Sequence, residues 1–284
     1  MSERSSYRIF LVGTGSAGTA LGLWLSRRGQ QLVGAWNRSE GRGRRASEFL
    51  PVQVSTGELA MLSDCDLVLV SVSDDSVALL GEQLRGMLRP GMILVHTSGS
   101  LPASALGEQP VPRGSLHPLV AMREPHIAAD ALNRTLLTVE GDEAARERLL
   151  DLMDGVGAKV QTLNAKAKTT YHAAAVIAAN LAVALVAEAT ELAAEAGVDD
   201  AERALAELAL VAMKNVTQQG AASGLTGPVI RGDIGTVQTH LDVLVGDTRE
   251  MYRLLSRRAV ELARVQGLSA HRCEELLALL GREN

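Results

Sequence analysis

The sequence has very few aromatic residues and no excess of positive charge. Phe, Trp and Tyr together make up 2% of the 284 residues, and the formal net charge at pH 7 is −5. Proteins that bind nucleic acid without base-specific contacts rely on basic grooves and on aromatic side chains that stack against bases. The composition therefore argues against a nucleic-acid partner.

Cysteine is almost absent, and so are metal-ligand patterns. The two cysteines, Cys65 and Cys273, lie far apart and form no C-x-x-C pair, and residues 1–6 do not resemble a secretory signal. The six histidines show no spacing typical of metal ligands, so no metal is expected. A reducing cytoplasm is the simplest compartment for such a chain.

One long stretch lacks charge and raises the question of a membrane. Residues 169–187 contain no Asp, Glu, Lys or Arg. Most of the stretch is alanine, and Tyr171, His172 and Asn180 interrupt it, so its apolar content is poor for a lipid span. We therefore expect a helix buried in protein, and no membrane partner.

The sequence does contain a glycine-rich turn with the spacing G-x-G-x-x-G. An apolar run at 9–12 precedes the turn, and an amphipathic stretch at 19–28 follows it. In such a strand–turn–helix unit the first glycine permits the turn, the second admits a pyrophosphate and the third allows close packing. The predicted cofactor-binding residues of the turn are Gly13, Thr14, Gly15, Ser16, Ala17 and Gly18. The alternative is a glycine-rich turn in a protein that binds no nucleotide.

The residues after the next apolar run favour NADP(H) over NAD. This run, at 31–36, ends in Asn37, Arg38 and Ser39, where an NAD site usually carries an acidic residue for the ribose 2′-hydroxyl. An amide, a guanidinium and a hydroxyl suit a 2′-phosphate instead. The basic cluster continues with residues that would equally suit a solvated loop, namely Arg42, Arg44 and Arg45.

Strand-like and helix-like segments alternate through the first half of the chain, which predicts a parallel, doubly wound sheet. Further strands are expected near 52–54, 66–72, 91–96, 113–116, 135–140 and 158–162, and helices at 74–88 and 142–153. From residue 165 the pattern is helical, with a glycine-rich interruption at 220–235 and at least two helices after it.

These patterns predict an α/β fold in two domains. A doubly wound, dinucleotide-binding domain would occupy residues 1–162, and an all-helical domain for substrate binding and dimerisation would occupy residues 163–284. Small residues on several faces of the helix at 165–197 need neighbours all round, so we expect a homodimer through the helical domain.

Polar residues at strand ends are further candidates, because ligands of open α/β sheets bind beyond the carboxyl ends of the strands. Ser71, Val72 and Ser73 are expected to contact the cofactor ribose, with a helix cap as the alternative. Ser98 would lie near the nicotinamide and donate to a substrate oxygen, or would only form a turn.

Two histidines are candidates for proton transfer. His117 directly precedes Pro118, which disfavours helix there, and it is either catalytic or a structural histidine of a turn. Lys168 and His172 are four residues apart on one helical face, and Asn180 follows on the same helix. Lys168 would contact substrate or be an exposed charge at the helix start, and Asn180 would orient the substrate or bond backbone.

Arg231 is the last candidate, in the segment at 225–233 that precedes a helix. It would bind a substrate carboxylate, or pair with Asp233 or a partner chain. Asp233 itself is expected to cap the following helix.

Four motifs together resemble a known family. G-T-G-S-A-G, S-L-H-P at 115–118, Y-H-A-A-A-V at 171–176 with Asn180, and T-G-P-V-I-R-G-D at 226–233 resemble the Rossmann-like oxidoreductases with a C-terminal helical domain of unknown function. The family is similar in fold to ketopantoate reductase, pyrroline-5-carboxylate reductase, prephenate dehydrogenase and 6-phosphogluconate dehydrogenase.

The resemblance implies roles for several residues. His117 with Pro118 resembles the His-Pro of prephenate dehydrogenases, whose histidine contacts the substrate hydroxyl, and Ser98 resembles their strand-end serine. Lys168 with His172 resembles the K-x-x-x-N of β-hydroxyacid dehydrogenases, with histidine in place of asparagine. The segment at 37–39 resembles the N-R-[ST] of members that use NADP.

The sequence therefore predicts an NADP(H)-dependent oxidoreductase for a small polar, carboxylate-bearing substrate. His117 or His172 would transfer the proton, Ser98 and Asn180 would orient the reacting atom, and Arg231 would hold an anion. A non-enzymatic NADP(H) sensor and a deazaflavin-dependent oxidoreductase remain the alternatives.

Overall fold

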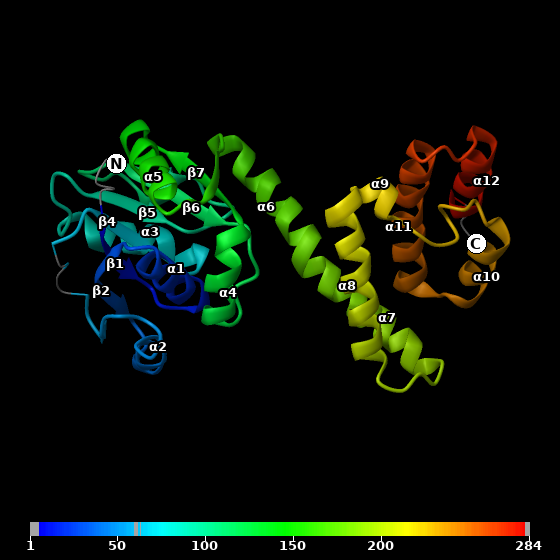
Figure 1. Cartoon of the computed structure of the whole chain (residues 1–284), viewed down its shortest axis with the longest axis horizontal. Coiled ribbons are helices and arrows are strands. Elements are labelled where there is room, and N and C mark those ends of the chain that lie inside the picture. Colours follow the sequence, from blue (N-terminus) through cyan, green and yellow to red (C-terminus); the bar gives the residue numbers. More distant parts are fainter. Residues whose placement is uncertain (1–5, 60–61, 63, 282–284) are drawn as a thin grey trace. The chain divides into compact units, whose positions relative to one another are not determined.

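The structure is a computed structural model that describes residues 6–59, 62 and 64–281. The chain divides into two compact units, the first reaching to Ala179 and the second beginning at Asn180 (Figure 1). The sequence changes character at residue 163, but the first unit continues past this point, because Lys168 and Tyr171 of the next helix hydrogen-bond residues of the sheet and its loops. The predicted α/β fold followed by a helical region is confirmed.

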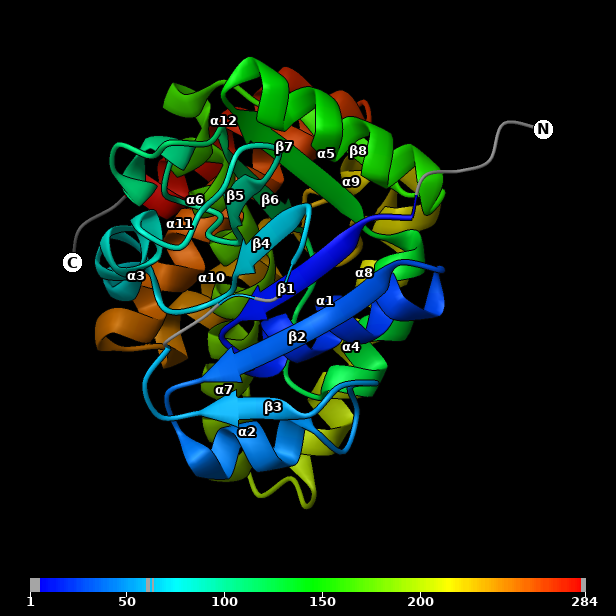
Figure 2. The same cartoon turned by 90° about the vertical axis from the view of Figure 1, so that its left-hand side faces the viewer.

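Eight strands in the described residues form one sheet, in the order β3-β2-β1-β4-β5-β6-β7-β8 (Figure 2). The strands are β1 (Arg8–Val12), β2 (Gln31–Asn37), β3 (Val54–Thr56), β4 (Leu67–Val70), β5 (Ile93–His96), β6 (Arg113–Pro118), β7 (Leu136–Gly141) and β8 (Lys159–Thr162).

The expectation of a wholly parallel sheet is wrong at one pair of strands. The six strands β3-β2-β1-β4-β5-β6 are parallel to one another. β7 pairs antiparallel with β6, and β8 runs parallel to β7. The chain enters β7 at the same edge of the sheet where it leaves β6. A backbone hydrogen bond from Leu119 N to Leu136 O (2.9 Å) links the two strands at this edge.

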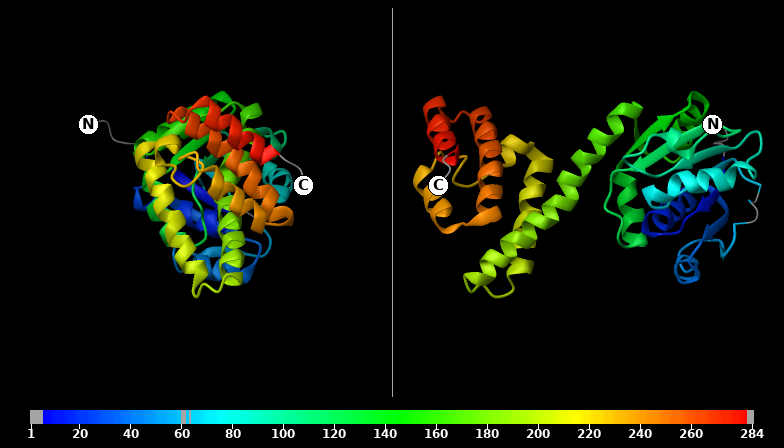
Figure 3. Two further views of the ribbon diagram at one scale, coloured as in Figure 1. Left: turned by 90° about the vertical axis from the view of Figure 1, so that its right-hand side faces the viewer. Right: turned by 180° about the vertical axis from the view of Figure 1, so that it is seen from behind.

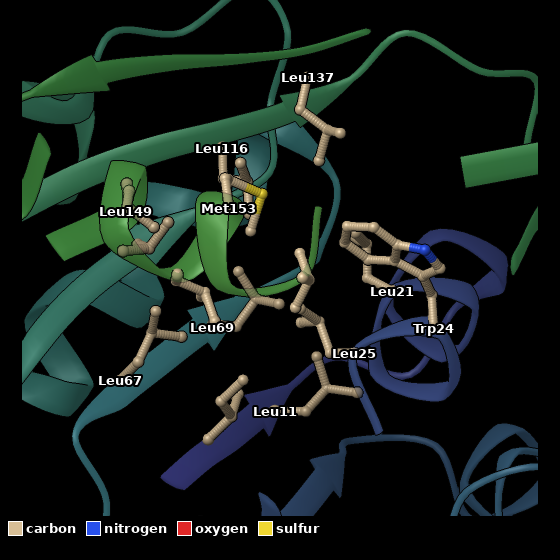
Figure 4. Close-up of a cluster of buried hydrophobic side chains, with 14 of the residues drawn as sticks. Leu11, Leu21, Trp24, Leu25, Leu67, Leu69, Leu116, Leu137, Leu149 and Met153 are labelled. Atoms are coloured by element: carbon tan, nitrogen blue, oxygen red, sulfur yellow. The ribbon is translucent and has the colours of Figure 1, made fainter. Parts of the chain in front are cut away.

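Helices of the first unit cover both faces of the sheet. They are α1 (Ser16–Arg27), α2 (Glu40–Ala46), α3 (Asp74–Arg85), α4 (Pro125–Ala131), α5 (Glu143–Gly155) and α6 (Lys168–Val176). Successive strand residues point to opposite faces, so each strand feeds two cores. Leu11 and Leu69 pack with Leu21 of α1 and Met153 of α5 (Figure 4). On the other face Val12 and its neighbours pack against α3.

The second unit is all-helical. Its helices are α7 (Ala182–Glu195), α8 (Ala201–Gln219), α9 (Ala221–Gly224), α10 (Ile234–Val243), α11 (Gly246–Val265) and α12 (Ala270–Gly281). α10, α11 and α12 enclose a core that includes Val237, Val260 and Leu276, and α11 and α12 lie side by side (Figure 3). Asp233 caps α10 as expected, because its carboxylate accepts from Thr236 N (3.0 Å).

The long apolar helix is exposed in the single chain, which corrects the expectation of a buried helix. The helix Ala165–Glu195 is long and apolar enough to cross a membrane by length and composition. An 18-residue stretch within it has a mean hydropathy of 1.8, and no residue of that stretch is buried. One such helix is weak evidence for a membrane protein. Within the second unit α7 packs against α8 and leaves its other sides open.

Candidate functional site

A cavity of about 750 Å³ lies at the carboxyl ends of the strands of the first unit. This size is in the range of cofactor and ligand sites. The predicted site residues that line it are Gly13, Gly15, Ser16, Ala17, Asn37, Arg38, Ser39, Ser71, Val72, Ser73, Ser98 and His117. Thus residues predicted for the cofactor and two predicted for catalysis share one cavity.

Two of the three glycines of the turn are required by packing, and the third faces open space. Gly13 has φ +93°, and a methyl group there would lie 2.2 Å from the Ser71 carbonyl oxygen. A methyl group on Gly18 would lie 2.1 Å from the Gly13 carbonyl oxygen, so both positions need glycine for packing. At Gly15, which lines the cavity and caps α1, a methyl group would meet nothing within 4 Å.

The open space over Gly15 and the free N–H groups at the start of α1 fit a dinucleotide phosphate. Thr14 and Gly18 do not line the cavity. Thr14 is buried, and its hydroxyl accepts from Asn37 Nδ2 (2.9 Å). Thr14 and Gly18 thus pack within the protein beside the turn. Their predicted contact with the cofactor stays a prediction.

The end of β2 presents positive charge to the cavity. The Asn37 side chain is buried, and its Oδ1 accepts from Ser39 N (2.8 Å), so it fixes the turn into α2. Arg38 and Arg42 both line the cavity, and neither forms an ion pair within the described part of the chain. Arg44 instead pairs with Glu40 (2.9 Å) on the exposed side of α2.

The end of β4 contributes backbone and hydroxyl groups. Ser73 is the N-cap residue of α3, but its hydroxyl shares a hydrogen bond with Ser76 Oγ (3.0 Å) and caps no backbone N–H. The hydroxyl of Ser71 accepts from Thr97 Oγ1 (3.1 Å), which ties β4 to the neighbouring strand end.

A buried histidine holds the turn after β5. His96 is fully buried, its Nδ1 accepts from Ser98 N (3.1 Å), and its Nε2 lies 3.1 Å from the Pro102 carbonyl oxygen. Burial lowers the pKa of His96 to about 4. Ser98 Oγ accepts from Leu101 N (3.1 Å), so Ser98 forms the turn of the structural alternative. Ser98 also lines the cavity, so the predicted position near a ligand holds as well.

His117 reaches the cavity from the end of β6. Its Nδ1 lies 3.0 Å from Tyr171 Oη, and burial, followed by the nearby Lys168 charge, lowers its pKa to about 4. The His117 ring meets the rings of both Tyr171 and His172 edge-on, with centroids 5.6 and 5.7 Å apart. A methyl group on Gly99 would lie 2.5 Å from His172 Nδ1 and 2.8 Å from His117 Nε2.

His172 lies next to the ring of His117 and does not line the cavity. Its Nδ1 is buried and has no hydrogen-bond partner among the described residues. The structure therefore brings His172 next to His117, and a direct role in proton transfer stays a prediction.

Lys168 is not the exposed charge that one alternative anticipated. The side chain is 1% exposed, and Nζ donates to the Ser98 carbonyl oxygen (3.0 Å) and to Ser115 Oγ (2.5 Å). Burial lowers its pKa to about 8, against the opposing effect of Glu140 and Asp74. Lys168 thus joins α6 to the ends of β5 and β6, and it does not line the cavity.

Asn180 and Arg231 belong to the second unit, and both are exposed. Asn180 lies in the π-helical segment Ile177–Leu181, a kind of distortion that often occurs at functional sites. Their roles toward a substrate stay predictions.

Some cavity residues were missed. Thr97 and Gly99 line the cavity, and so does Asp74, whose carboxylate accepts from Ser100 Oγ (2.6 Å). The sequence motifs assign no role to Tyr171, although its position three residues after Lys168 puts both on one helical face. That spacing was the available signal for a second polar group beside His117.

The strand order and the glycine turn define a Rossmann-like dinucleotide-binding fold. Residues 3–120 match the family model of the Rossmann-like domain, and residues 135–259 match that of the domain of unknown function DUF2520. The chain thus combines a match to a Rossmann-like domain with a match to a DUF2520 domain, and the predicted resemblance is confirmed.

Two solved structures share this fold. A Bacteroides fragilis structure, provisionally described as an NADP oxidoreductase, is 25% identical with a TM-score of 0.73, covering 90% of this chain and 98% of that one. A Thermotoga maritima protein is 23% identical with a TM-score of 0.72, covering 91% of this chain and 99% of that one.

A curated relative matches only in part. The glycerol-3-phosphate dehydrogenase [NAD(P)+] of Desulfitobacterium hafniense is 26% identical over 163 residues, which are 51% of this chain and 46% of that protein. The chain therefore spans about half the length of this relative. In fold and sequence it is similar to NAD(P)-dependent oxidoreductases.

Proposed function

We propose that this chain is an NADP(H)-dependent oxidoreductase that acts on a small polar, carboxylate-bearing substrate. The observation that carries the proposal is one cavity that extends from the glycine turn to His117 and takes in Arg38 and Arg42. The similarity to an NADP oxidoreductase over 90% of the chain supports it. The bound nicotinamide would supply or accept the hydride.

The residues of the cavity would divide the remaining work. Gly15 and the start of α1 would hold the pyrophosphate, and Arg38, Ser39 and Arg42 would hold a 2′-phosphate. Ser98 and His117 would hydrogen-bond the reacting oxygen or nitrogen of the substrate. Lys168, by bonding Ser98 and Ser115, would keep those strand ends in place.

The choice of NADP(H) is tested by removing the two unpaired guanidinium groups. We expect the double variant Arg38→Ala, Arg42→Ala to lose about 10-fold or more in NADPH affinity, about 1.4 kcal/mol, and little in NADH affinity. Fluorescence titration with each nucleotide measures both values. Arg44→Ala is the matched control, because Arg44 is equally basic but pairs with Glu40. An equal loss for NADPH and NADH would contradict the 2′-phosphate assignment.

Activity is tested separately, by following NADPH consumption with a panel of 2-oxo acids and imines. Turnover that His117→Ala reduces would support the assignment of the substrate end. Binding of NADPH without turnover of any substrate would favour the sensor alternative.

We also propose that a second copy of the chain covers the exposed apolar side of the second unit. α7 and α8 pack against each other, yet Val183 is 71% exposed, Leu208 65% and Val211 55%. Apolar side chains gathered on neighbouring helices usually mark an interaction surface. A homodimer would also supply the neighbours that the small residues of α7 lack within one chain.

A further inference from the structure

Tyr171 is hydrogen-bonded to His117, the histidine that lines the cavity. His117 lies at the end of β6 and Tyr171 on α6, and the Nδ1-to-Oη distance is 3.0 Å. The opposite edge of the imidazole faces Gly99, where a methyl group would lie 2.8 Å from Nε2. Nε2 therefore lies on the ring edge away from Tyr171, beside Gly99, and both Gly99 and His117 line the cavity.

The direction of the hydrogen bond follows from the acidity of the two groups. A phenol is a better donor than a neutral imidazole N–H, and an imidazole nitrogen is a better acceptor than a phenol oxygen. Burial raises the pKa of Tyr171, and a hydrogen bond with Thr138 acts in the opposite direction. With the phenol donating to Nδ1, a neutral imidazole carries its hydrogen on Nε2.

The surrounding groups favour the neutral ring. Burial is the largest cause of the lowered pKa of His117, and Lys168, His172 and His96 act in the same direction, whereas Asp74 opposes them. A neutral ring carries one N–H, so the hydrogen bond at Nδ1 decides which nitrogen holds the hydrogen at neutral pH.

We propose that Tyr171 is a positioning residue that fixes the tautomer of His117, so that a neutral Nε2–H points toward the reacting atom of the substrate. Such a donor stabilises negative charge that develops on an oxygen or nitrogen during hydride transfer. The reaction rests on the proposed function, whereas the tautomer is a property of the free protein. The two parts are therefore tested separately.

Nitrogen-15 NMR of the histidine rings in the full chain without ligand reads the tautomer directly. The His117 signals are assigned by their loss in His117→Gln. We expect an acceptor-type Nδ1 and a hydrogen-bearing Nε2 in the wild-type protein at neutral pH. Hydrogen on Nδ1, or an even mixture of tautomers, would overturn the proposal without the need for any Tyr171 variant.

Tyr171→Phe removes the hydroxyl and keeps the ring. We expect the His117 signals to move toward a mixture of tautomers, and an unchanged spectrum would overturn the proposal. The second unit offers a matched control in the pair His240 and Tyr252, with Nδ1 and Oη 2.9 Å apart and ring centroids 5.7 Å apart. Tyr252→Phe should move the His240 signals and leave those of His117 unchanged.

Kinetics test the consequence for the reaction. Tyr171→Phe should lower kcat about 10-fold, the value of roughly one hydrogen bond, with little change in NADPH affinity or in KM. Tyr252→Phe should leave kcat unchanged. A Tyr171→Phe enzyme with wild-type kcat would overturn the catalytic part. If NADPH does not bind the wild-type protein, the proposed function fails, and the NMR result still decides the tautomer.

Discussion

His96 shows at the scale of one residue how a buried side chain shapes the cavity. Its two ring nitrogens face Ser98 N and the Pro102 carbonyl oxygen, and this fixes the loop that carries Ser98 and Gly99. The ring can make both bonds only when it is neutral, as donor at one nitrogen and acceptor at the other. Protonation of His96 should therefore disturb the loop.

The lowered pKa of His96 predicts an acid-sensitive window. The pKa is about 4 in the folded chain against an ordinary 6.5, so the unfolded chain binds more protons between these values. The free energy of unfolding should fall as the pH drops from 6.5 toward 4. We expect His96→Gln, which cannot titrate, to be less stable near neutral pH but to lose less on acidification.

Urea unfolding at several pH values in this window measures the effect. The exposed His271 provides the control variant, His271→Gln. A His96→Gln protein with the same pH dependence as the wild type would contradict the assignment.

The sequence alone predicts the position of some side chains of the site but not of others. The roles of Gly13, Gly15 and Gly18 follow from local spacing, because strand, turn and helix are consecutive in the chain. The burial of Lys168 could not be read in this way. It depends on Ser98 and Ser115, which lie 70 and 53 positions away and come together only in the folded sheet.

At the scale of the element, the glycines of the turn between β1 and α1 have different roles, one in binding and one in folding. Gly15 has φ −69° and ψ −175°, which any residue adopts, and a methyl group there would point into open space. Gly18, by contrast, is pressed against the Gly13 carbonyl oxygen. An alanine at Gly15 should therefore affect nucleotide binding, and an alanine at Gly18 should affect the stability of the fold.

We expect Gly15→Ala to change the free energy of unfolding by less than about 0.5 kcal/mol, because it meets no neighbour. It should weaken NADPH binding about 10-fold or more, since the methyl group occupies the space above the turn. Gly18→Ala should lower the free energy of unfolding by about 1–3 kcal/mol through overpacking. Urea unfolding and NADPH titration of both variants test this, and a destabilised Gly15→Ala that binds NADPH normally would contradict it.

Most elements could be predicted from apolar periodicity, with ends off by a few residues. The run at 66–72, for example, became the strand Leu67–Val70. The reversal at β7 could not be predicted, because a strand pattern is the same in both directions. The helix α2 was hidden for another reason, since its seven residues include two glycines and three arginines and show no apolar stripe.

At the scale of the molecule, the exposed side of α7 and α8 predicts self-association. Light scattering should give a mass of about twice 30.0 kDa for the wild-type protein. The double variant Leu208→Glu, Val211→Glu should shift the mass toward one chain, because buried charge without a partner is costly. Ile127→Glu is the control, as Ile127 is 60% exposed on α4 of the first unit. A wild-type mass of one chain would contradict the dimer.

The central claim is that the cavity of the first unit binds NADP(H). Fluorescence titration of the wild-type protein with NADPH and with NADH tests it most directly. We predict saturable binding of both nucleotides, with NADPH at least about 10-fold tighter because of its 2′-phosphate. Binding of neither nucleotide, or tighter binding of NADH than of NADPH, would contradict the account.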